Sequence, residues 1–184
     1  MFVALREGWN VTFLLWIYWS QSIIIGLFNF IRILQLKEFS TKGVKLFGKF
    51  ADPTIQTKIR SAIIFLLYYG LFCLFSSMAI RDYAPGTISS HELTFIYSAS
   101  LLFFLNHLFS YIYNRPRDAQ KQNIGTLVFF PFVRIIPMYL IFVFAPIFSL
   151  GVALPLFLLL KTFADALMHI AEHQIVRKNK EHLA

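Results

Sequence analysis

Charged residues and cysteine are both scarce in this chain, in which 14% of the 184 residues are charged and Cys73 is the single cysteine. One cysteine cannot form a disulfide within the chain. The sequence also contains no glycine-rich phosphate loop, dinucleotide fingerprint or nucleophile elbow, so no common nucleotide-binding or hydrolase motif is recognisable. The net charge of +8 is concentrated in particular loops. That distribution indicates membrane topology, and we expect no nucleic-acid partner.

Apolar residues are abundant instead, at 58% of the chain, and 18% of the residues are aromatic. They form charge-poor runs of about 20 residues, each long enough to cross about 30 Å of hydrocarbon as a helix. The fold class predicted is therefore all-α, a polytopic transmembrane helical bundle that forms one domain over residues 1–184. We expect it in the cell membrane, as a multi-pass protein of a bacterial inner membrane.

Five spans are predicted, and they cover residues 11–34, 61–80, 92–113, 125–146 and 150–173. The first apolar run is too long and too aromatic for a cleaved signal peptide, so we expect it to be a retained span. The last two spans are joined by a short uncharged connection around Pro146 and Gly151, which predicts an antiparallel helical hairpin.

The loops predict the orientation of these spans. Basic residues are concentrated between spans one and two, between spans three and four, and in the tail: Lys37, Lys42, Lys45, Lys49, Lys58, Arg60, Arg115, Arg117, Lys121, Arg177, Lys178 and Lys180. The loop after span two has one basic residue, Arg81, and the loop after span four has none. The positive-inside rule then places the N-terminus outside and the C-terminus in the cytoplasm.

The first cytoplasmic loop has an amphipathic pattern. On a helical wheel its apolar residues fall on one side and its basic residues on another: Phe39, Leu46, Phe47 and Phe50 against Lys42, Lys45 and Lys49. This pattern predicts an interfacial helix between spans one and two that lies on anionic lipids. A basic loop without helix is the alternative, because Gly43 and Gly48 weaken a helix.

Polar residues recur in the cytoplasmic halves of four spans, although ionisable groups at membrane depth are costly and are functional candidates by default. The candidates are Asn29, Arg32, His107, Ser110, Arg134, Lys161, Asp165, His169, Glu172 and His173. Their convergence in one leaflet predicts a polar pocket near the cytoplasmic surface. By contrast, Ser22, Gly26 and Asn29 form a small and polar stripe that we interpret as a helix-packing face. Pro131 and Pro137 should interrupt the hydrogen bonds of span four.

Asp165, His169 and His173 follow one another at intervals of four residues, so all three lie on one face of a helix. Eight residues separate the outer two, a rise of about 12 Å, so one ion cannot bind all three. A single site would use one adjacent pair and a ligand from another helix, for which His107 is the natural donor. Nitrogen and oxygen ligands of this kind suit zinc or another transition-metal ion.

Two other interpretations of the same residues stay open. Lys161 and Asp165 are four residues apart and could form an ion pair, with His169 and His173 as ordinary interfacial residues. Alternatively, the polar residues could relay protons or ions.

Five segments, in this order, resemble a bacterial polytopic membrane family known as a domain of unknown function: YWSQSIIIGLFNFIRIL, YYGLFC, FFLNHLFSYIYN, FFPFVRIIPMYLIF and LLKTFADALMHIAEH. The resemblance is strongest in the last, and it also covers His107, Ser110 and Arg134. It implies a multi-pass fold and no particular activity. Relatives often carry glutamate at the position of Gln21 and histidine at those of Tyr68, Ser76 and Tyr139, so the resemblance implies fewer metal ligands in this chain.

Three functions are compatible with these patterns. The first is a membrane protein with a metal- or proton-binding pocket. The second is a non-catalytic small subunit or oligomeric scaffold, which would associate with a second copy or with another membrane protein. The third is a zinc-dependent membrane hydrolase acting on a lipid-like substrate, in which Ser110 or Glu172 would assist a metal-activated water.

Overall fold

The computed structural model describes residues 11–46, 48–83, 88–118, 122–144, 155–164 and 166. The chain divides into two compact units. Residues 12–132 form what we call the first unit, and residues 1–11 together with 133–184 form the second unit. The expectation of one domain over 1–184 stays a prediction.

Four helices confirm the first four predicted spans: α2 (Val11–Gln35), α3 (Ile55–Tyr83), α4 (Ser90–Asp118) and α5 (Ile124–Phe144). Each is long and apolar enough to cross a membrane. Of the fifth predicted span, 150–173, the structure describes the apolar helix Pro155–Ala164 and Ala166. The rest of that span lies outside the described residues.

Polar caps determine where three of the helices begin. Thr54 precedes α3, and its Oγ1 accepts a hydrogen bond from the backbone N–H of Thr57 at 3.2 Å. Before α4, Ser89 and Glu92 form a capping box in which each side chain accepts a hydrogen bond from the other's backbone N–H. Asn123 caps α5, since its Oδ1 accepts from the N–H of Gly125 at 2.8 Å.

The predicted interfacial helix between spans one and two is wrong. The segment forms β1 (Phe39–Ser40) and a hairpin of β2 (Lys45–Leu46) and β3 (Lys49–Phe50). Gly43 and Gly48 have φ angles of +79° and +82°, in the left-handed region that breaks a right-handed helix. Their conformations turn the chain twice, so a sequence with helical periodicity folds back on itself as strands.

The two basic loops meet at one end of the first unit. β1 pairs in parallel with β4 (Gln122–Asn123), although they belong to different loops. In addition, the Lys58 side chain donates to the carbonyl oxygen of Leu36, just past the end of α2, at 3.0 Å. Loops one and three therefore lie on the same side, which confirms the alternation of the first four spans.

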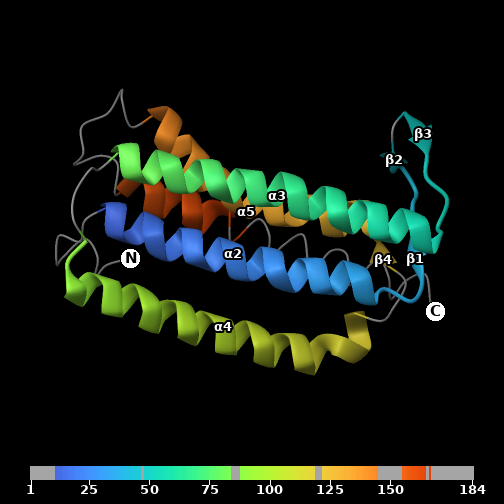
Figure 1. The fold of residues 1–184 in the computed structure, drawn as a ribbon, viewed down its shortest axis with the longest axis horizontal. Helices are drawn as coiled ribbons and strands as arrows, with labels where there is room; N and C mark the ends of the chain where they lie inside the picture. The colour runs from blue at the N-terminus through green and yellow to red at the C-terminus, as the bar shows by residue number, and fades with distance from the viewer. Residues whose placement is uncertain are drawn as a thin grey trace. The chain divides into compact units, whose positions relative to one another are not determined.

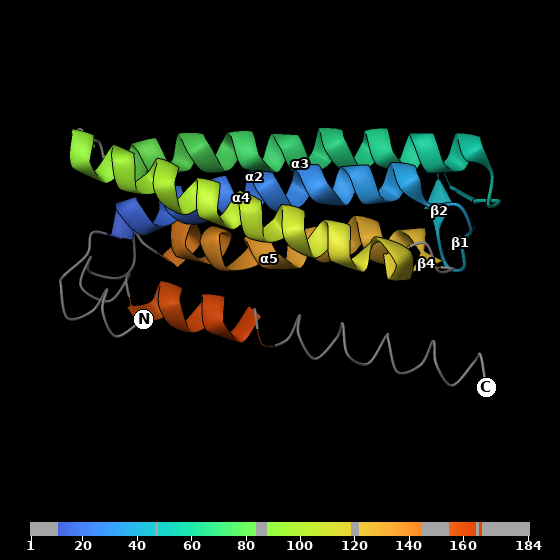
Figure 2. The ribbon, with the colours of Figure 1, turned by 90° about the horizontal axis from the view of Figure 1, so that it is seen from below.

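Helix α2 packs against α3 and α4, and Figures 1 and 2 show it running beside both. Toward α4, the rings of Phe13 and Phe95 lie 5.6 Å apart. Toward α3, the indole of Trp19 donates to the carbonyl oxygen of Cys73 at 2.7 Å. Side chains on α2 therefore reach the neighbouring helices on two sides.

Candidate functional site

Asn29 of α2 binds the backbone of α5. Its side-chain nitrogen donates to the carbonyl oxygen of Leu127 at 2.9 Å, and Asn29 itself is buried. In an α-helix that carbonyl would accept from the N–H four residues later, but residue 131 is proline and has no N–H. Asn29 thus supplies the donor that Pro131 lacks, and the expected interruption of span four is compensated from another helix.

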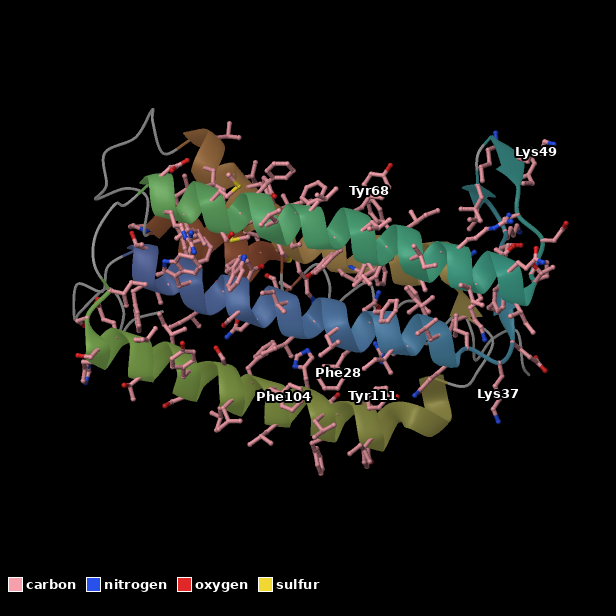
Figure 3. The ribbon with its side chains drawn as sticks, viewed as in Figure 1. Phe28, Lys37, Lys49, Tyr68, Phe104 and Tyr111 are labelled. Carbon is pink, nitrogen blue, oxygen red and sulfur yellow. The ribbon has the colours of Figure 1, made fainter. Side chains whose placement is uncertain are left out.

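His107 of α4 lies in a group of aromatic rings. Its imidazole stacks on the ring of Phe103 with centroids 4.3 Å apart and an interplanar angle of 29°. The buried ring of Phe28 on α2 is 6.0 Å away, and it also contacts Phe104 at 5.5 Å and Tyr111 at 5.6 Å. Figure 3 shows Phe28, Phe104 and Tyr111 gathered between α2 and α4. The half-buried imidazole therefore has an environment that is mostly aromatic.

The stripe on α2 is a packing face, as predicted. The hydroxyl of Tyr69 on α3 donates to the carbonyl oxygen of Ser22 at 2.9 Å. A Cβ added to Gly26 would lie 2.4 Å from Cε1 of Tyr69, so this ring rests directly on the backbone of α2. On the side of α4, the hydroxyls of Ser20 and Ser100 share a hydrogen bond of 2.7 Å. Polar groups in these spans thus join helices to one another.

Other predicted site residues fall in different parts of the chain. Arg32, in the last turn of α2, is half-buried, and Ser110 on α4 is exposed. Arg134 and Lys161 belong to the second unit and are half-buried. The remaining candidates lie outside the described residues: Asp165, His169, Glu172 and His173.

The predicted metal set stays a prediction. Within the part of the chain that the structure describes, no group of three or more His, Cys, Asp or Glu residues could hold a metal ion. Of the four proposed ligands, this part includes only His107.

Sequence reasoning missed the roles of Trp19 and Tyr69, whose side chains reach backbone oxygens on a neighbouring helix. Gly26 gave a signal for Tyr69, because a glycine inside a span permits close approach of a large ring. The sequence also showed that the carbonyl of Leu127 would lack its helical donor, since Pro131, four residues later, has no N–H. The sequence could not show that Asn29 donates to this carbonyl, because 98 positions separate Asn29 from Leu127.

Comparison with known proteins identifies a family but no activity. The family described as "Family of unknown function (DUF6498)" matches residues 1–182. No curated protein and no solved structure matches the chain significantly.

Proposed function

Since the chain belongs to this family of unknown function, we propose from its geometry that it is a non-catalytic, oligomeric scaffold in the cell membrane. The observation that carries the proposal is the side chain of Tyr68, at the middle of α3. It is 60% exposed, and the described part of the chain offers its hydroxyl no hydrogen-bond partner. Figure 3 shows it pointing away from α2.

The depth of Tyr68 makes this exposure costly. Arg60 and Arg81 are 21 residues apart on α3, a rise of about 31 Å, which matches the hydrocarbon thickness. Tyr68 then lies about 12 Å of helix rise inside the level of Arg60. A hydroxyl without a hydrogen-bond partner in such surroundings costs roughly 1–3 kcal/mol, judged from mutational data on proteins. A polar group from another molecule would remove this cost.

A second copy of the chain provides such a group. In a dimer with its two-fold axis along the membrane normal, the same face of α3 meets itself, and both Tyr68 side chains lie at one depth. A phenol hydroxyl can donate and accept, so the two can bond to each other. Leu71, Phe75 and Met78 follow on the same helix at intervals of three and four residues and are exposed, which gives this face an apolar surface for packing.

The test is the oligomeric state of the Tyr68→Phe variant, measured by energy transfer between labelled copies in vesicles at several lipid-to-protein ratios. Hydrogen bonds between membrane helices contribute about 0.6–1.7 kcal/mol, so self-association should weaken about 3-fold to 18-fold. The matched control is Tyr97→Phe, because Tyr97 is 66% exposed on α4 and should not affect association. A monomeric wild type, or equal effects of the two variants, would contradict the proposal.

A second candidate function is metal or proton binding, favoured by the position of a half-buried imidazole, His107, within a span. We propose His107 as one candidate ligand and, separately, one adjacent pair from the stripe Asp165, His169 and His173 as candidate ligands for zinc or a similar ion. Elemental analysis of protein purified without a histidine tag or chelator tests this directly. About one metal ion per chain, lost in His169→Ala, would support it, and a metal-free, folded wild type would contradict it.

An enzymatic version of this site makes a further demand. A zinc-dependent hydrolase would also turn over a lipid-like substrate, and the activity would disappear together with the metal in His169→Ala. Arg134, Lys161 and Glu172 would then act as polar support in the second unit.

A further inference from the structure

The β2–β3 hairpin has one face toward the helices of the first unit and one face away from them. Lys45 and Phe50 are directly paired across the strands, so their side chains share a face, and both are exposed. The Lys45 ammonium lies over the Phe50 ring, 4.8 Å from its centroid. Val44 and Leu46 alternate with them and are half-buried. The outward face therefore presents a cation and a large aromatic ring together.

Several contacts hold the hairpin in place. The Asn123 side chain donates to the carbonyl oxygen of Lys42 at 3.0 Å, just before β2. Val44 packs so closely on the start of α5 that a Cβ on Gly125 would lie 2.8 Å from its Cγ2. The backbone N–H of Ala51 donates to Val44 at 3.1 Å and extends the ladder. The hairpin is thus attached to the cap and the first turn of α5.

The hairpin lies at the depth of lipid headgroups. In Figures 1 and 2 it is located at the end of the first unit where α2 ends and α3 begins. Ile55, the first residue of α3, is five residues beyond Arg60, a rise of about 7.5 Å outside the hydrocarbon boundary placed at Arg60. Headgroups and hydrocarbon together are about 40–45 Å thick, so roughly 5–8 Å of headgroup region lies on each side.

We propose that the outward face of this hairpin binds the headgroups of anionic phospholipids in the adjacent leaflet. Lys45 would contact lipid phosphates, and Phe50, which is 74% exposed, would insert at the boundary of the acyl chains. Phenylalanine is among the residues that interfacial amphipathic segments bury at the boundary between headgroups and acyl chains. Ile55, the first residue of α3, is 71% exposed at the same end of the unit.

The first test measures depth in the full-length protein. A nitroxide label is placed at residue 50 by Phe50→Cys in a Cys73→Ala background, and at residue 52 by Asp52→Cys as the matched control. Both positions are exposed. In vesicles containing phosphatidylglycerol, the label at 50 should be more accessible to oxygen and less to a water-soluble nickel chelate than the label at 52. Equal accessibility to the nickel chelate would overturn the proposal.

The second test measures lipid selectivity without changing Phe50. The association of spin-labelled phosphatidylglycerol, relative to phosphatidylcholine, is compared for wild type, for Lys45→Gln, and for Lys49→Gln as the charge-matched control, because Lys49 is exposed but pairs with Leu46 on the opposite face. A lysine at the membrane surface contributes up to about fivefold in affinity, so Lys45→Gln should reduce the preference for phosphatidylglycerol up to about fivefold and clearly more than Lys49→Gln. Equal reductions would show that net charge alone attracts the lipid and would overturn the proposal.

Discussion

At the scale of single residues, the interaction between Asn29 and Leu127 shows how a proline and a polar residue can compensate for each other inside a span. Pro131 removes the N–H that would satisfy the Leu127 carbonyl, and Asn29 donates to that oxygen at 2.9 Å. While Asn29 and Pro131 are both present, neither destabilises the span, because the Asn29 amide and the Leu127 carbonyl are hydrogen-bonded to each other. The role of Asn29 is therefore structural in the first unit.

Substituting Asn29 by Ala should destabilise the protein by about 1 kcal/mol, because the Leu127 carbonyl then has no donor. The same substitution in a Pro131→Ala background should cost less, since the new N–H at residue 131 can complete the helix. Unfolding in mixed detergent micelles measures all four proteins of this double-mutant cycle. If the cost of Asn29→Ala is the same with and without the proline, the compensation is not what stabilises α5.

At the scale of the elements, α2 and α3 approach closely because a glycine faces a tyrosine. The Tyr69 ring rests on Gly26 and is held from the other side by aromatic contacts, with Phe65 stacked at 5.1 Å and Phe132 edge-on at 5.4 Å. Its hydroxyl also donates a hydrogen bond to the carbonyl oxygen of Ser22. The ring therefore cannot move aside without breaking contacts on α2, α3 and α5.

Replacing Gly26 by Ala should consequently destabilise the protein by about 1–3 kcal/mol, the usual range for overpacking. Gly70→Ala on α3 is the matched control, because nothing lies within 4 Å of its added Cβ. There the higher helix propensity of alanine should leave stability unchanged or raise it by up to about 1 kcal/mol. The same detergent unfolding assay compares the two. Similar changes in stability for Gly26→Ala and Gly70→Ala would mean that the Tyr69 ring does not prevent a side chain at position 26.

At the scale of the whole molecule, the pairing of β1 with β4 connects loops that are far apart in the sequence. It requires α2, α3 and α4 to alternate in direction, so that both basic loops are at one end. The positive-inside rule predicts that this end faces the cytoplasm.

Cysteine labelling of intact cells tests this topology in a Cys73→Ala background. An impermeant maleimide should label Ile88→Cys, between α3 and α4, from outside. It should label Lys37→Cys after permeabilisation alone, because Lys37 is exposed at the opposite end of the first unit (Figure 3). Labelling of Lys37→Cys in intact cells would invert the orientation, and equal labelling of both would contradict the alternation of the spans.

The amino-acid sequence by itself determined the class of fold and the approximate positions of four spans, because hydrocarbon thickness translates directly into the length of apolar runs. The bounds were less exact, since α3 begins at Ile55 and α4 ends at Asp118, outside the predicted ranges 61–80 and 92–113. It also identified the packing stripe on α2. The strand β1 and the β2–β3 hairpin depended instead on two glycines adopting positive φ, and a periodic pattern of Phe and Lys does not encode that choice. The partner of Asn29 and the position of Tyr69 were decided by tertiary structure alone. Such contacts depend on which faces of distant helices meet, and that is set by the packing of the first unit as a whole.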